Sequence, residues 1–111
     1  MTFAVQSTPR NGSVVIAVTG DVDIATADEL RAHLARAVEC HEVVVVDLAG
    51  VGFMDSTGLG VLVASYNRAA RSGRRLVVAR PQKIVKNALR LVQVDTVINV
   101  YETLDAALAA V

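Results

Sequence analysis

The sequence is poor in the residues on which metal, redox and disulfide chemistry depend. Its 111 residues include one cysteine, Cys40, two histidines and no tryptophan. A single cysteine cannot form an internal disulfide, and two scattered histidines do not complete a set of zinc ligands. We therefore expect no metal and no cofactor, and we interpret Cys40 as a small apolar residue that fills space in the core.

An excess of charge of one sign is also absent. The 11 Lys and Arg residues cancel the 11 Asp and Glu residues. Without a basic surface, counterion release cannot drive nucleic-acid binding, and an aromatic content of 4% leaves few rings for base stacking. No segment approaches the roughly 20 apolar residues that cross a bilayer, and no signal peptide is evident. These absences predict a cytoplasmic protein that binds neither nucleic acid nor a membrane directly.

The residues that are present describe one folded domain. A hydrophobic content of 53% excludes disorder. A chain of this length is the size of a single ordinary domain, which we place over residues 1–111. One fold unit therefore has to carry the whole function.

Two alternating apolar stretches predict an antiparallel hairpin at the start of the chain. Phe3 and Val5 share one face of the first stretch, and every second residue over 14–18 shares one face of the second. Between them stands Asn11-Gly12, a pair that tolerates the positive φ angles of a tight hairpin turn.

Strands and helices alternate after this hairpin. A Thr26-x-x-Glu29 capping box, in which two side chains accept from free N–H groups, predicts a helix that ends near Cys40. Four valines over 43–46 predict a strand buried on both faces. The later elements are a helix from residue 59, a strand over 76–79, a helix over 82–91, a strand over 97–100 and a helix over 104–111. This order predicts an α/β fold, a mixed and mostly parallel sheet of about five strands with an N-terminal hairpin, packed with four helices.

Helical spacing also predicts which side chains face the core or the helix ends. In the helix over 82–91, the residues predicted to face inward are Ile84, Val85, Ala88 and Leu91. In the last helix, they are Leu104, Ala107, Leu108 and Val111. The arginines that crowd the end of the second helix, where we expect them to complement the helix dipole, are Arg68, Arg71, Arg74 and Arg75.

Two loops that follow predicted strands are the candidate sites, because open α/β sheets bind ligands at the carboxyl ends of their strands. They span residues 20–23 and 47–58. Gly50-x-Gly52 begins like a dinucleotide fingerprint, but Asp55 stands where the third glycine should fall and would repel a pyrophosphate. A Walker A pattern is absent as well, which argues against a nucleotide site.

Enzyme interpretations of the second loop lack essential residues. The motif at 55–58 has one residue more than the Asp-Ser/Thr-Gly of aspartic proteases, and helical spacing begins directly after it. Ser56 has no Gly-x-Ser-x-Gly elbow around it. Asp47 resembles the phosphoacceptor of receiver domains, but Thr8-Pro9 stands where those domains need an acidic pair. We therefore expect no enzyme activity.

The second loop ends in a hydroxyl at the start of a helix. Asp55, Ser56 and Thr57 are all residues that can cap a helix N-terminus. A helix N-terminus also offers free N–H donors and a positive dipole end, so it can host a phosphate. Ser56 is therefore a candidate phosphorylation site as well as a candidate cap.

These residues resemble the signature of a known family. The segment FMDSTGLGVL at 53–62 is similar to the signature loop and helix of the STAS domain, specifically of bacterial anti-sigma factor antagonists. The similarity extends to residues 19–23 and to the valine run that ends at Asp47-Leu48, so it covers nearly all of the chain. The resemblance implies the family's mixed sheet covered by helices, in agreement with the element order above.

The resemblance also implies roles for individual residues. Ser56 matches the serine that a cognate anti-sigma factor, itself an ATP-dependent serine kinase, phosphorylates, and a PP2C-type phosphatase usually reverses the modification. Thr57 offers a second hydroxyl, so the choice between Ser56 and Thr57 stays open. The residues implied to contact the partner are Asp21, Asp23, Met54, Asp55, Thr57, Gly58 and Leu59.

The function that the resemblance implies is regulatory. We predict an anti-sigma factor antagonist that binds a kinase-type anti-sigma factor and frees the sigma factor until phosphorylation of Ser56 switches it off. The alternative is a STAS scaffold or regulatory subunit, as in a stressosome or a lipid-transport complex, that phosphorylation does not control. In either case we expect a monomer or a weak dimer.

Overall fold

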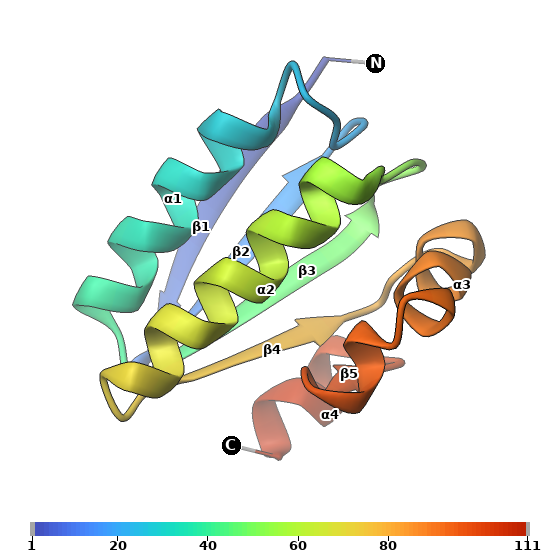
Figure 1. Ribbon diagram of the computed structural model, residues 1–111. Helices are drawn as coiled ribbons and strands as arrows, with labels where there is room; N and C mark the ends of the chain where they lie inside the picture. The colour runs from blue at the N-terminus through green and yellow to red at the C-terminus, as the bar shows by residue number, and fades with distance from the viewer. Residues whose placement is uncertain (1, 111) are drawn as a thin grey trace.

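A single five-stranded sheet with helices on both faces organises the molecule (Figure 1). The computed structural model describes residues 2–110. The strands are β1 (Ala4–Arg10), β2 (Ser13–Thr19), β3 (Val43–Gly50), β4 (Arg75–Ala79) and β5 (Val100–Tyr101). The helices are α1 (Ala27–Cys40), α2 (Ser56–Arg71), α3 (Lys83–Leu91) and α4 (Leu104–Ala109), with a 3₁₀ turn η1 (Val94–Thr96) before β5.

The strand order in the sheet follows the chain order, β1-β2-β3-β4-β5. β1 pairs antiparallel with β2, and the other three pairings are parallel. Asn11 and Gly12 turn the hairpin with φ angles of 42° and 88°, as the Asn-Gly pair predicts. The predicted mixed sheet with an N-terminal hairpin and four helices is therefore confirmed.

The two faces of the sheet carry unequal cores. Because each parallel crossover steps in the same direction, right-handed connections place α1, α2 and α3 on one face. Val14, Ile16 and Val18 of β2 pack on that larger core, whereas Val15 faces the smaller core under α4. The valine run in β3 is buried on both faces, as predicted.

The end of the chain departs from the predicted pattern. Of the strand predicted over 97–100, only Val100 lies in β5, because residues 97–99 form an irregular segment between the 3₁₀ turn and β5. In α3 the buried side chains are Val85 and Leu89, while Ile84 and Leu91 are exposed, contrary to prediction. The reason is that Val94 and Ile98 from the segment after α3 complete the core beside Val85 and Leu89. In α4, Ala107 is buried as predicted, and Val111 lies outside the described residues.

One of the four arginines near the end of α2, Arg74, caps a different helix from the one predicted. Arg68 and Arg71 do lie in the last turn of α2. Arg74, however, donates from Nη1 to the carbonyl oxygens of Val38 at 2.8 Å, Glu39 at 2.9 Å and His41 at 3.1 Å. It therefore satisfies the free carbonyls at the end of α1 and ties the two helices together.

Cys40 is also placed differently from the prediction. It is exposed at the last position of α1, so it does not fill space in the core. The buried stripe of α1 is formed by other residues, among them Leu30, Leu34 and Val38. Within residues 2–110, the longest helix is the 16-residue α2, and no helix has the length and apolar character to span a membrane.

Candidate functional site

The two candidate loops meet at the carboxyl end of the sheet. We name residues 20–26 the β2–α1 loop and residues 51–55 the β3–α2 loop. Val22 joins them, because its N–H donates to the carbonyl of Phe53 at 2.9 Å and its own carbonyl accepts from the N–H of Asp55 at 3.1 Å. Residues that lie about 30 positions apart in the sequence therefore form one surface beside the start of α2 (Figure 1).

The β2–α1 loop is held by Thr26 rather than by a capping box. The Thr26 hydroxyl donates to the carbonyl of Asp21 at 2.9 Å and accepts from the N–H of Asp23 at 3.0 Å. Asp23 Oδ1 in turn accepts from the N–H of Ala25 at 2.9 Å. The predicted capping box with Glu29 is thus wrong, because the loop has already taken the hydroxyl that the box would need.

Asp55 is the residue that caps α2. Its Oδ1 accepts from the N–H of Gly58 at 3.1 Å, and its carbonyl accepts the first helical hydrogen bond from Leu59 at 3.0 Å. Of the three residues that the sequence left open, Asp55 takes the cap, and Ser56 becomes the first residue of the helix. Ser56 is exposed and Thr57 is half-buried. Ser56 therefore presents the more accessible hydroxyl, at the positive end of the α2 dipole.

Negative charge gathers around this hydroxyl. Asp21 is exposed, and Asp23 and Asp55 are partly exposed. Among the described residues, none of the four ion pairs includes any of the three. The surface beside Ser56 therefore combines one accessible hydroxyl with three carboxylates that have no ion-pair partner among the described residues.

Three of the predicted partner contacts lie beneath this surface. Met54 is 4% exposed, Leu59 is 8% exposed and Gly58 is buried. A Cβ placed on Gly58 would lie 2.7 Å from Met54 Cγ and 2.7 Å from Val22 Cγ1, so only glycine fits there without a shift. These residues support the loops from below, and a partner can reach little of their side chains in this conformation.

Two other hydrophobic side chains of the loops are exposed and can reach a partner, unlike the buried Met54 and Leu59. Ile24 in the β2–α1 loop is 81% exposed, and Phe53 in the β3–α2 loop is 46% exposed. No local pattern in the sequence separates these two side chains from Val22 and Met54, the apolar residues of the same loops that are buried. We add both residues to the candidate site.

Asp47 belongs to a structural ion pair at the end of β3. Its carboxylate is buried and accepts from Arg80 Nε at 3.1 Å, from Arg80 Nη2 at 2.5 Å and from the N–H of Ala49 at 3.1 Å. The hydrogen bonds and charge of Asp47 raise the pKa of Arg80 above its ordinary value. With its oxygens engaged in this way, Asp47 supports the loop above it, which agrees with rejecting a receiver-type phosphoacceptor.

The Asp47–Arg80 pair is expected to stabilise the fold measurably. Asp47→Ala should lower the free energy of unfolding by about 2 kcal/mol, less than the 3–5 kcal/mol of fully buried pairs because Arg80 stays half exposed. Glu102→Ala, which removes the exposed pair with Lys86, should cost less than about 1 kcal/mol. Urea unfolding of the two variants tests this, and equal losses would contradict the assignment.

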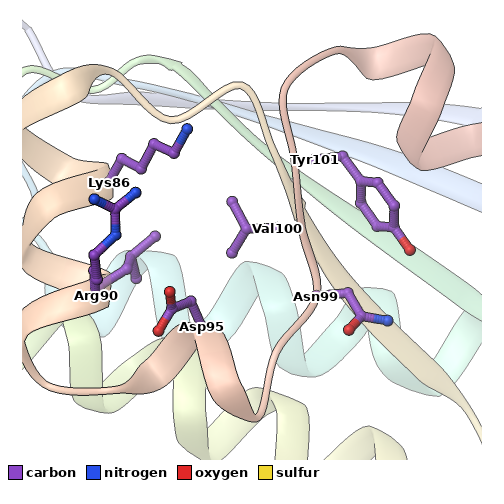
Figure 2. Close-up of a pocket in the computed structure, with 7 residues that line it drawn as sticks. Lys86, Arg90, Asp95, Asn99, Val100 and Tyr101 are labelled. Atoms are coloured by element: carbon purple, nitrogen blue, oxygen red, sulfur yellow. The ribbon is translucent and has the colours of Figure 1, made fainter.

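A separate hollow of about 410 Å³ lies between α3 and β5 (Figure 2). The side chain of Val100 there is surrounded by Lys86, Arg90 and Asp95. No residue of the β2–α1 loop or the β3–α2 loop lines this hollow. Lys86 is already paired with Glu102. Within residues 2–110 no group of three or more His, Cys, Asp or Glu side chains is placed to hold a metal ion.

Comparison with known proteins shows similarity over nearly the whole chain. The model of the STAS domain family matches residues 3–107. The anti-sigma-F factor antagonist RsfB of Mycobacterium tuberculosis is 30% identical over 103 residues, which cover 92% of this chain and 84% of that relative.

Solved structures share the fold. An anti-sigma factor antagonist from Mycobacterium paratuberculosis superposes with a TM-score of 0.92 at 28% identity, over 99% of this chain and 94% of that one. The anti-sigma factor antagonist SpoIIAA matches in fold in its unphosphorylated form, with a TM-score of 0.80 at 19% identity, over 95% of this chain and 93% of that one. Its phosphorylated form matches with a TM-score of 0.73 at 17% identity, over 98% of both chains.

Proposed function

The chain belongs to the STAS domain family, and from this we propose that it is an anti-sigma factor antagonist controlled by phosphorylation of Ser56. The observation that carries the proposal is the exposed Ser56 at the start of α2, beside three carboxylates that have no ion-pair partner among the described residues. The relative in M. tuberculosis is named as an anti-sigma-F factor antagonist, which supports the same role here.

In the proposed mechanism the unmodified surface binds the partner. The two loops and the start of α2 dock on a kinase-type anti-sigma factor, which then releases its sigma factor. The anti-sigma factor supplies ATP and the kinase activity, so this chain acts as a substrate and a ligand and needs no cofactor of its own. A PP2C-type phosphatase restores the unmodified form.

Phosphorylation changes the electrostatics of this surface without requiring a new fold. A phosphoserine adds about −1.5 to −2 charge at neutral pH. The free N–H groups and the positive dipole end of α2 can tolerate that charge in the free protein. In a complex, however, the phosphate would be desolvated next to Asp23 and Asp55. We therefore expect the modified form to stay folded and to lose its partner.

The proposal is tested by identifying the modified residue. The purified chain would be incubated with ATP and each serine-kinase anti-sigma factor encoded in the same genome, and its intact mass measured. We expect one phosphate on the wild type and on Thr57→Ala, and none on Ser56→Ala. The exposure of Ser56 against the half-buried Thr57 is the physical reason.

The other outcomes have definite meanings. A phosphate that persists on Ser56→Ala and disappears from Thr57→Ala would move the site to the second hydroxyl. A wild-type chain that none of these kinases modifies would favour the alternative role, a STAS scaffold or regulatory subunit that phosphorylation does not control.

A further inference from the structure

We infer that the partner which contacts Ser56 also binds the first turn of α3, through Ile84. The inference rests on the proposed function and adds a part of the chain that lies outside the family signature. Ile84 is 65% exposed, although it was predicted to face the core. Its position in the fold, at the same end of the sheet as the two loops, is what connects it to Ser56.

The start of α3 is fastened to the site by its N-cap residue. Gln82 Nε2 donates to the carbonyl of Ala49, at the end of β3, at 2.8 Å. A Cβ on Gly52, in the β3–α2 loop, would lie 4.0 Å from Gln82 Oε1. The first turn of α3 therefore adjoins the β3–α2 loop, as the ribbon also shows (Figure 1).

Three exposed hydrophobic side chains follow one another along this end of the sheet. Ile24 follows β2, Phe53 follows β3 and Ile84 follows β4, and these three strands are neighbours. We call the three side chains the apolar row. Single exposed hydrophobic residues are common on protein surfaces. A row that lies beside polar and charged groups has the composition of a protein interface, in which apolar anchors are surrounded by a polar rim.

The charges beside the apolar row define the chemistry of the partner. At one end of the apolar row, the two loops carry Asp21, Asp23 and Asp55. At the other end, Lys83 is the chain neighbour of Ile84. Within residues 2–110, Lys83 takes part in none of the ion pairs. The complementary occupant is a folded protein surface with an apolar strip, basic side chains opposite the loops and an acidic side chain opposite Lys83. Because the negative charges lie at one end of the row and the positive charge at the other, we expect the partner to bind in one orientation along the row.

A matched pair of substitutions on one helix tests the inference. Ile84→Glu and Leu91→Glu each place a carboxylate on an exposed position of α3, because Leu91 is 85% exposed at the far end of the helix. Affinity of the unphosphorylated chain for the kinase-type anti-sigma factor that modifies it would be measured by calorimetry. We expect Ile84→Glu to weaken binding about 30-fold or more, as for an interface hot spot. Leu91→Glu should bind within about threefold of the wild type, and Lys83→Glu should fall between the two.

The outcomes separate this inference from the function on which it rests. If the wild type binds and Ile84→Glu, folded by circular dichroism, binds equally well, the inference is wrong and the proposed function stands. If the wild type binds none of the anti-sigma factors, the proposed function fails first. If sedimentation shows a wild-type dimer that Ile84→Glu dissociates and Leu91→Glu does not, a second copy covers the row and the inference is also wrong.

Discussion

Ser56→Asp is expected to weaken binding to the kinase-type anti-sigma factor about 100-fold or more, equivalent to about 2.7 kcal/mol. Ser56→Ala is expected to bind within about threefold of the wild type, because the alanine removes only a hydroxyl. Calorimetric titration of the three purified proteins at one salt concentration measures both effects. A large loss of affinity with the charged residue and almost none with the neutral one is the signature of an electrostatic switch.

The physical reason is the charge that already surrounds Ser56. Asp21, Asp23 and Asp55 are accessible to solvent in the free protein, where water screens their repulsion with a new carboxylate. A bound partner removes that water, and an unpaired charge in an interface is costly. A decisive switch from 99% bound to 1% bound needs about 5.5 kcal/mol. Because a single carboxylate carries less charge than a phosphate, the aspartate sets a lower limit on the effect of phosphorylation.

Two controls separate the switch from a loss of structure. Ser56→Asp should keep a thermal midpoint close to that of the wild type, since a carboxylate in the first turn of α2 interacts favourably with the helix dipole. The part of the binding loss that comes from repulsion between solvent-exposed charges should also shrink with added salt, because the Debye length falls from about 10 Å at 0.1 M to about 3 Å at 1 M, whereas the cost of desolvating the carboxylate should persist. Equal affinity of Ser56→Ala and Ser56→Asp would refute control by charge at this position.

Gly58→Val, in the first turn of α2, is expected to lower the free energy of unfolding by about 2–3 kcal/mol. The Cβ of the new side chain would lie 2.7 Å from Met54 Cγ and 2.7 Å from Val22 Cγ1, and 3.2 Å from the Val22 carbonyl oxygen. Val22 is the residue that joins the two loops, so relief of this overlap has to move the loops apart. Urea unfolding measures the loss, and the thermal midpoint should fall by about 10 °C or more.

The same helix supplies the control for this prediction. Gly60 is also in α2, but nothing lies within 4 Å of a Cβ at that position. Gly60→Val should therefore change stability by no more than about 0.5 kcal/mol, with a small gain from the better helix propensity of valine. If the two valine variants unfold at the same urea concentration, the close packing of Gly58 against Val22 and Met54 does not restrict the residue at this position.

Much of the fold follows from short-range patterns in the chain. The Asn11-Gly12 turn, the valine run of β3 and the stripe of α1 were identified from the sequence, because each reflects a local rule for backbone angles or side-chain period. The prediction of the inward face of α3 was right for Val85 and wrong for Ile84 and Leu91, because the amphipathic pattern of the helix admits two apolar faces. Val94 and Ile98, which lie beyond the helix, determine which of the two is buried.

The candidate site was also predicted only in part from the sequence. The sequence predicted Ser56 as a candidate site, because a hydroxyl at a helix start has a local signature, and the resemblance to the STAS signature added the acidic loop at Asp21 and Asp23. It did not distinguish Met54 and Leu59, which are buried, from Phe53, which is exposed. Neighbours in a loop have no fixed side-chain period, so their burial depends on contacts made elsewhere in the chain.

From the sequence alone came the element order, the position of the hydroxyl and the near-absence of metal-binding and aromatic residues. These depend on composition and on neighbours within a few positions. Only the folded chain brings Ile24, Phe53 and Ile84 to one end of the sheet, seats Gly58 against Val22 and places Arg74 on the end of α1. Such contacts join residues about 30 positions or more apart, and their geometry is set by the parallel pairing of the strands, which no local pattern contains.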